Sequence, residues 1–332
     1  MSSPLQYVFD TLHTRKISLL ILISLIPLYG VAGFHYGLTL AILGLTVTGS
    51  AWLTDTLMNF SVKTRDDLQT IVWALILTLF LPPQTPWFAG LVAGFLMSLL
   101  KRLMGGNTGL WINPMLAAWA FCRLSWPNSW SGTKLSPALG AFHHAVLKGT
   151  PLASNLFSTL DKSPVDQAFT STLNNSFFSW IHTNLPSGYG DLIAGNLSGS
   201  FLAGSTILLL LVSVFLLVER LVPWEIPAFA VLGLVVPTWV FGGLSGGSWL
   251  SGDVLLQLFG GSFLFGVLFL ATDSFSRPFF RSSRRIYGLL IGLFVFILRF
   301  SGTQIDGTGE AILLAGLTVP WLDQLFQRFR TV

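Results

Sequence analysis

The stretch FLAGSTILLLLVSVFLLVE, residues 201–219, decides the fold class of this chain. It holds one charged residue, Glu219, at its last position. A helix that crosses the hydrocarbon core of a bilayer needs roughly 20 mostly apolar residues. This stretch has that length and composition, and it therefore predicts a transmembrane helix.

The whole chain shares the character of this stretch. Of its 332 residues, 52% are hydrophobic and 10% are charged, whereas an average soluble domain carries about 25% charged residues. So little charge cannot cover so much apolar surface in water. This excludes a soluble globular enzyme, a disordered chain and a nucleic-acid-binding protein. The sequence instead predicts an all-α polytopic membrane protein that contacts the lipid bilayer.

About ten stretches match the same template. The fifth is short and opens with Asn113-Pro114, as a half-helix would, because proline is well tolerated at the first helical position. A polar segment, 127–200, separates the first five spans from the last five. We therefore expect a first membrane half (1–126), a long extracytoplasmic loop (127–200) and a second membrane half (201–332). The candidate spans are residues 17–34, 37–54, 68–83, 86–103, 113–126, 201–219, 225–243, 253–272, 285–301 and 307–326.

The placement of basic residues predicts the orientation in the membrane. If the N-terminus is cytoplasmic, thirteen of the eighteen Lys and Arg residues lie in inward loops and tails, as the positive-inside rule requires. Arg123 and Arg299 are near outer helix ends. Both termini are therefore expected in the cytoplasm. The thirteen residues are Arg15, Lys16, Lys63, Arg65, Lys101, Arg102, Arg220, Arg277, Arg281, Arg284, Arg285, Arg328 and Arg330.

Three acidic residues are candidates for an ion pathway, because carboxylates inside a bilayer are costly and often functional. Asp273 ends the eighth candidate span; it is either an interfacial acid beside Arg277 or a carboxylate on a cation route or near a cofactor. Asp306 and Glu310 open the tenth span. The helix dipole favours acids in the first turn, which is enough to explain Asp306. Glu310 lies deeper and is harder to explain in that way.

The sequence gives little support for a disulfide, an iron–sulfur site or a haem site. The single cysteine, Cys122, excludes a disulfide within the chain and a four-cysteine iron–sulfur site. None of the five histidines lies in the middle of a candidate span, where a b-type haem would need its ligands. We therefore expect no metal site and assign no catalytic residue. Composition and spacing alone do not name a reaction.

Several stretches, in order along the chain, together resemble one family. The most specific run starts with FGVLFLATD (265–273) and RRIYGLLIG (284–292) and ends with PWLD (320–323). The resemblance is to the RnfD membrane subunit of the Rnf ion-translocating ferredoxin:NAD oxidoreductase and to the related NqrB subunit of the sodium-translocating NADH:quinone reductase. Further matches are Asp67, Leu81-Pro82-Pro83, Gly105-Gly106, Asn113-Pro114, Ile297-Leu298-Arg299, Asp306-Gly307 and Ala311-Ile312-Leu313-Leu314.

The resemblance implies a covalently bound flavin. In the family, an outer threonine in a Ser/Thr-Gly-Ala-Thr-Pro-Leu-like motif carries FMN through a phosphoester bond, which a separate flavin transferase makes. The matching stretch here is KGTPL (148–152), with Thr150 as the acceptor. Residues 147–149 depart from the motif, and His144 stands where an Asp is expected. A simple Thr-Pro turn stays open as the alternative, and so does a second, non-covalent flavin.

The resemblance also implies a function. The chain would be a flavin-linked subunit of a redox complex in the bacterial cytoplasmic membrane, coupling electron transfer through its partner subunits to Na⁺ or H⁺ movement. It holds no nicotinamide site, so the isolated chain should show no turnover, and whether it counts as an enzyme stays open. The alternatives are a flavin-free transporter or channel on the same scaffold, and a scaffold subunit that only holds its partners.

Overall fold

The described part of the chain is helical throughout. The computed structural model describes residues 4–58, 67–104, 112–127, 206–241, 254–300 apart from 275, and 306–330, with the isolated residues 171, 172 and 175. These residues contain no strand, which confirms the all-α prediction. The longer helices are α1 (Pro4–Tyr36), α2 (Leu38–Met58), α3 (Asp67–Phe80), α4 (Trp87–Leu103), α5 (Pro114–Ser125), α11 (Thr206–Val218), α12 (Glu225–Phe241), α15 (Arg281–Phe300) and α16 (Thr308–Arg330).

The eighth candidate span is broken into three pieces. They are α13 (Val254–Phe259), α14 (Phe263–Phe265) and the π-helix η4 (Gly266–Leu270). The break falls at Gly260 and Gly261, where Gly261 has a φ of +74°. Glycine adopts this left-handed conformation without a steric penalty. If the three pieces are taken as one broken span, the described residues form ten helical segments, as expected from the sequence.

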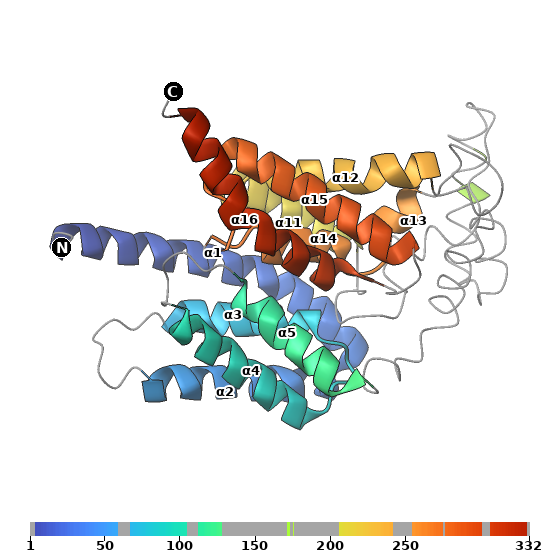
Figure 1. The fold of residues 1–332 in the computed structure, drawn as a ribbon. Helices are drawn as coiled ribbons and strands as arrows, with labels where there is room; N and C mark the ends of the chain where they lie inside the picture. The colour runs from blue at the N-terminus through green and yellow to red at the C-terminus, as the bar shows by residue number, and fades with distance from the viewer. Residues whose placement is uncertain are drawn as a thin grey trace.

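The helices form two packed groups (Figure 1). In one, α2 packs against α3 and α4, and α4 packs against α5; in the other, α15 packs against α12 and α16. Helix α1 runs beside α3 and also touches α11. By length and composition, the segments Arg15–Phe34 and Leu38–Met58 can cross a membrane, while α3, α11 and α12 contain shorter apolar stretches.

Glycines let two helix pairs approach closely. A Cβ on Gly94 of α4 would lie 2.2 Å from the backbone oxygen of Val47 in α2, and a Cβ on Gly292 of α15 would lie 2.2 Å from that of Ala230 in α12. Apolar surfaces gain little by leaving lipid for one another, so close packing of this kind holds membrane helices together. The α2–α4 and α12–α15 contacts therefore form the tight centre of each group.

The two glycine-bearing helices follow one pattern. Helix α4 has Gly90 and Gly94, and a buried Lys101 follows seven residues after the second glycine. Helix α15 has Gly288 and Gly292, and a buried Arg299 follows at the same spacing. The division into two membrane halves stays a prediction.

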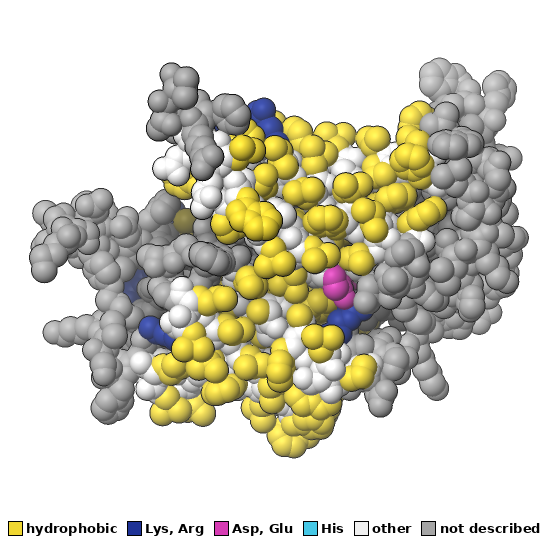
Figure 2. Space-filling view, in the orientation of Figure 1, with side chains coloured by type: hydrophobic (Ala, Val, Ile, Leu, Met, Phe, Trp, Pro, Cys, Tyr) yellow, Lys and Arg dark blue, Asp and Glu magenta, His cyan; other side chains and the backbone are white. Residues whose placement is uncertain are grey.

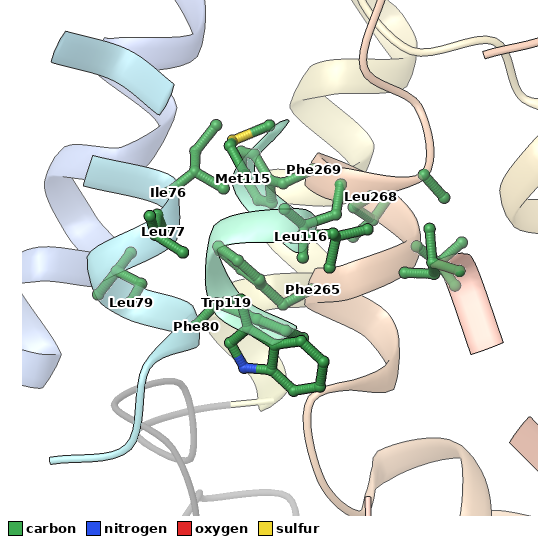
Figure 3. Close-up of a cluster of buried hydrophobic side chains, with 14 of the residues drawn as sticks. Ile76, Leu77, Leu79, Phe80, Met115, Leu116, Trp119, Phe265, Leu268 and Phe269 are labelled. Atoms are coloured by element: carbon green, nitrogen blue, oxygen red, sulfur yellow. The ribbon is translucent and has the colours of Figure 1, made fainter. Parts of the chain in front are cut away.

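A cluster of large apolar side chains fills the space between the two groups. Figure 3 shows side chains from α3, α5, α14 and η4 converging there. The ring of Phe80 lies 5.3 Å from that of Trp119 and 6.4 Å from that of Phe265, and Phe265 lies 4.7 Å from Phe269. These rings join the two helix groups in one core.

Apolar side chains also dominate the outside of the molecule. Figure 2 shows one face covered mostly by hydrophobic side chains, with few charged ones. Phe34 is 89% exposed and Leu124 is 82% exposed, and large exposed apolar residues occur on each of the longer helices except α3. Water would disfavour such a surface, whereas lipid tails accept it.

Candidate functional site

Asp306 lies just before α16 in a dense set of hydrogen bonds. Its carboxylate accepts the backbone N–H of Ser262 at 3.1 Å and the hydroxyls of Ser262 and Thr308, the latter at 2.7 Å. Gly261 leaves room for this arrangement, because a Cβ there would lie 2.6 Å from Oδ1 of Asp306. The turn at Gly260-Gly261 therefore places donors directly on the carboxylate.

Arg299 completes the surroundings of Asp306. Its side chain is buried, and its Nη2 lies 3.1 Å from Oδ1 of Asp306. Its Nε donates to the backbone oxygen of Asp306 at 2.8 Å, and its other nitrogens donate to Gln257 and to the backbone oxygen of Gly260. Both charges are thus compensated and hydrogen-bonded, as a stable buried ion pair requires. Arg299 and Asp306 fasten α15, the broken span and the start of α16 to one another.

Glu310 lies in the first turn of α16 and faces Arg123, in the last turn of α5. Nη1 of Arg123 is 2.5 Å from Oε1 of Glu310, and the two side chains are 25% and 22% exposed. The contact is an ion pair by distance, but neither carboxylate oxygen of Glu310 has a hydrogen-bond partner within the described part of the chain. Glu310 is therefore held far more loosely than Asp306.

Trp119 connects this ion pair to the core. The guanidinium of Arg123 lies 5.2 Å from the centre of the Trp119 ring, within the range of a cation–π contact. Gly309, the neighbour of Glu310, packs on the same indole, because a Cβ there would lie 2.5 Å from a ring carbon. The first turn of α16 thus packs against α5, and the ion pair lies at the edge of the aromatic core.

Asp273 follows the π-helix, three residues beyond the end of the broken span, whereas Ser262 lies at the break in its middle. It is half-buried, and the hydroxyl of Ser276 donates to its carboxylate at 3.4 Å. Arg277 is next to it, and its backbone N–H donates to the backbone oxygen of Asp273 at 3.2 Å. Burial lowers the pKa of Arg277, as does the nearby charge of Arg284, while Asp273 opposes the change. The structure therefore brings Asp306 and Glu310 together but leaves Asp273 apart from them.

The candidate flavin acceptor, Thr150, lies outside the described residues. The same holds for His144 and for the whole KGTPL stretch. Among the residues that the structure describes, no group of three or more His, Cys, Asp and Glu side chains could hold a metal ion.

A second group of charged side chains, between α2, α3 and α4, was not expected from the sequence. Asp55 is 1% exposed and accepts two hydrogen bonds from Arg102, at 2.9 and 3.0 Å, and one from Thr70 at 3.1 Å. Thr70 in turn accepts from the buried Lys101 at 3.0 Å. The one signal for this cluster was an acid inside an apolar run, but the expected span ended at residue 54.

Comparisons with known proteins agree with the resemblance drawn from the motifs. Residues 2–331 match the model of the NQR2, RnfD, RnfE family. The chain is similar to the D subunit of the Na⁺-translocating ferredoxin:NAD⁺ oxidoreductase complex of Acetobacterium woodii, with 28% identity over 315 residues, covering 94% of this chain and 88% of that protein. It is also similar to the D subunits of the ion-translocating oxidoreductase complexes of Haemophilus ducreyi (31% identity; 79% and 77% covered) and Pseudomonas paraeruginosa (30% identity; 77% and 72% covered).

Proposed function

Because the chain belongs to the NQR2, RnfD, RnfE family, we propose that it is a membrane subunit of a bacterial ion-translocating oxidoreductase complex. Three relatives carry the name of such a subunit. In this role the chain works with other subunits, which hold the electron donor and acceptor sites. It couples their electron transfer to the movement of Na⁺ or H⁺ across the cytoplasmic membrane, with both termini on the inner side.

One observation carries the ion-transport half of this proposal. Two carboxylates, Asp306 and Glu310, lie at one end of α16 in a bundle whose surface and core are mostly apolar. Acidic groups in such surroundings are costly and mark ion routes. Asp306 is fully hydrogen-bonded and shapes the site, whereas Glu310 keeps free acceptor capacity for a passing cation. Asp273, just beyond the end of the broken span, is the third residue of the proposed pathway.

Cation uptake tests this half of the proposal. The complete complex is reconstituted in proteoliposomes, and Na⁺ and H⁺ movement is followed with and without an electron donor. We expect uptake only when electrons flow, and none from vesicles that hold this chain alone. Uptake by the isolated chain without electron transfer would instead identify the flavin-free transporter, which the altered residues around Thr150 favour.

The flavin half of the proposal rests on the KGTPL stretch. We propose that a flavin transferase attaches FMN to Thr150 through a phosphoester bond, and that the flavin supplies one- and two-electron redox chemistry when it is bound. Lys148, two residues away, adds a positive charge that favours a phosphate. Thr150 offers the hydroxyl that such a bond requires.

Fluorescence of the denatured chain tests the covalent bond. With the transferase co-expressed, the wild-type band should fluoresce under ultraviolet light after SDS denaturation, because a covalent flavin survives unfolding. Thr150→Ala should lose the fluorescence completely, while Thr133→Ala, a threonine in the same segment, should keep it. A dark wild-type band would exclude covalent attachment but would leave the ion-transport half to the uptake measurement.

A further inference from the structure

The two arginine–carboxylate pairs at this end of α16 differ in how firmly they are held. Asp306 accepts hydrogen bonds from Arg299, Ser262 and Thr308. Glu310 makes one ion contact with a side chain, that of Arg123, and its Oε2 has no hydrogen-bond partner among the described residues. A carboxylate held by one contact exchanges its partner far more easily than one held by several. Glu310 is thus the exchangeable carboxylate of the two.

The helices that carry Arg123 and Glu310 stabilise each charge separately. Glu310 lies in the first turn of α16, where the helix dipole favours an anion, and Arg123 lies in the last turn of α5, where it favours a cation. The indole of Trp119 supports the guanidinium as well. Both carboxylate oxygens of Glu310 are buried, however, so the charge of Glu310 still needs a positive partner when Arg123 moves away. The contact can therefore open at low cost only when another cation takes the place of Arg123 at Glu310.

The pair also joins the two helix groups. Arg123 belongs to α5 in the first group, and Glu310 belongs to α16 in the second. Gly309 lets α16 pack closely on Trp119 of α5. A small shift of α16 relative to α5 therefore changes the distance between the two charges. A movement between the two helix groups would therefore change the Arg123–Glu310 distance directly.

From these observations we propose that Arg123 is a tethered cation that occupies Glu310 at rest and withdraws to admit the transported cation. The guanidinium and the transported Na⁺ or H⁺ compete for the same carboxylate, so Glu310 always has a positive partner. Arg123 is then a positioning residue that closes the pathway between transport events. This inference rests on the proposed function, because it needs a cation that passes Glu310.

Passive cation leak separates this role from a merely structural one. The complete complex is reconstituted in vesicles, and Na⁺ and H⁺ efflux is measured without electron donor. Arg123→Gln should raise the leak several-fold and lower donor-driven uptake, while Arg123→Lys, which keeps the charge, should stay close to wild type. Arg123→Gln/Glu310→Gln should return the leak to the wild-type level, because the carboxylate that passes the cation is gone. The matched control is Arg102→Gln, which removes the arginine from a different carboxylate and should not leak.

A second variant covers the case in which Arg123→Gln does not assemble. Glu310→Asp keeps the carboxylate but shortens it by one methylene, which pulls it away from Arg123, and it should leak in the same way. The proposal is overturned if assembled Arg123→Gln and Glu310→Asp complexes leak no more than wild type, or if Arg102→Gln leaks equally. A wild-type complex that shows no donor-driven uptake would contradict the proposed function, while the leak comparison would still decide the role of Arg123.

Discussion

Asp55 and Glu310 are both acidic residues in apolar helices, but they differ in the number of hydrogen bonds that their carboxylates accept. Asp55 is 1% exposed and is held by Arg102 and Thr70. Glu310 keeps an oxygen without a hydrogen-bond partner within the described residues. The number of donors on a carboxylate thus separates a residue that fastens helices from one that can exchange a cation.

Asp55→Asn tests the fastening role. The change removes the charge that compensates Arg102 and weakens the contact with Thr70, so we expect the complex to lose about 2–3 kcal/mol of stability. This loss is smaller than the roughly 3–5 kcal/mol usual for a broken buried ion pair, because Arg102 is 23% exposed and can reach water. Thermal unfolding in detergent measures the loss.

The control for Asp55→Asn is its neighbour on the helix. Thr56 donates to the backbone oxygen of Trp52 on the outside of α2. Thr56→Ala should therefore change stability by no more than about 0.5 kcal/mol. If both variants unfold at the wild-type temperature, Asp55 does not hold α2, α3 and α4 together.

Residues of this kind show where the sequence stops being informative. Glu310 stood out because it lies deep in an apolar span, and the structure gives it the partner Arg123. That partner is 187 residues away in the chain, so no local pattern could have paired them. Asp55 was missed because the expected span ended one residue before it, while Lys101 and Arg102 looked like ordinary basic residues at an inner helix end.

At the scale of elements, the helix pairs α2–α4 and α12–α15 depend on the absence of side chains at a few positions. A Cβ on Gly292 would lie 2.2 Å from the backbone oxygen of Ala230 and 2.6 Å from the backbone of Gly233. Backbone atoms cannot rotate away as a flexible side chain can. The two helices would have to move apart along much of their length.

Gly292→Ala should therefore destabilise the protein although alanine is the better helix former. We expect a loss of about 1–3 kcal/mol, the usual cost of overpacking a tight contact, measured by thermal unfolding in detergent. Gly316→Ala in α16 is the matched control, because its Cβ would meet nothing within 4 Å; it should be neutral or gain up to about 1 kcal/mol. Equal effects at the two glycines would show that helix propensity, not the α12–α15 contact, decides the outcome.

The bounds of the elements were largely predictable, and the exceptions have physical reasons. Nine of the ten expected spans correspond to a single helix, because uninterrupted apolar stretches leave few alternatives in lipid. Helix α1 begins at Pro4, well before the expected apolar run, since a helix can continue beyond the membrane. The eighth span breaks at Gly260-Gly261 because Arg299 and Asp306 bind the turn there, and those contacts come from distant parts of the chain.

At the scale of the whole molecule, the ion pairs sharpen the argument from charge placement. Arg123 and Arg299 are two of the five basic residues outside the expected inward loops and tails; the others are Lys134, Lys148 and Lys162. Each of the two arginines is paired with a carboxylate, Glu310 or Asp306. A paired arginine adds no net charge to its side of the membrane, so these two arginines do not oppose the expected orientation.

Helices α4 and α15 share a spacing of two glycines and one basic residue. These helices are the fourth and ninth segments, so in the expected topology they cross the membrane in opposite directions. The same sequence pattern then places Lys101 at the inner end and Arg299 at the outer end. Each basic side chain binds a polar neighbour in its own group: Thr70 for Lys101, and Asp306 for Arg299.

The distance along the chain between Arg123 and Glu310 also matters while the protein is being made. The ribosome adds roughly 5–20 residues per second, so the 187 residues between them take about 10 to 40 seconds to synthesise. During that time the nascent chain carries Arg123 without its carboxylate. Helix α5 has 12 residues, a length of about 18 Å, which falls short of a bilayer core of about 30 Å. The long side chain of Arg123 can therefore reach the headgroups until α16 supplies the carboxylate of Glu310.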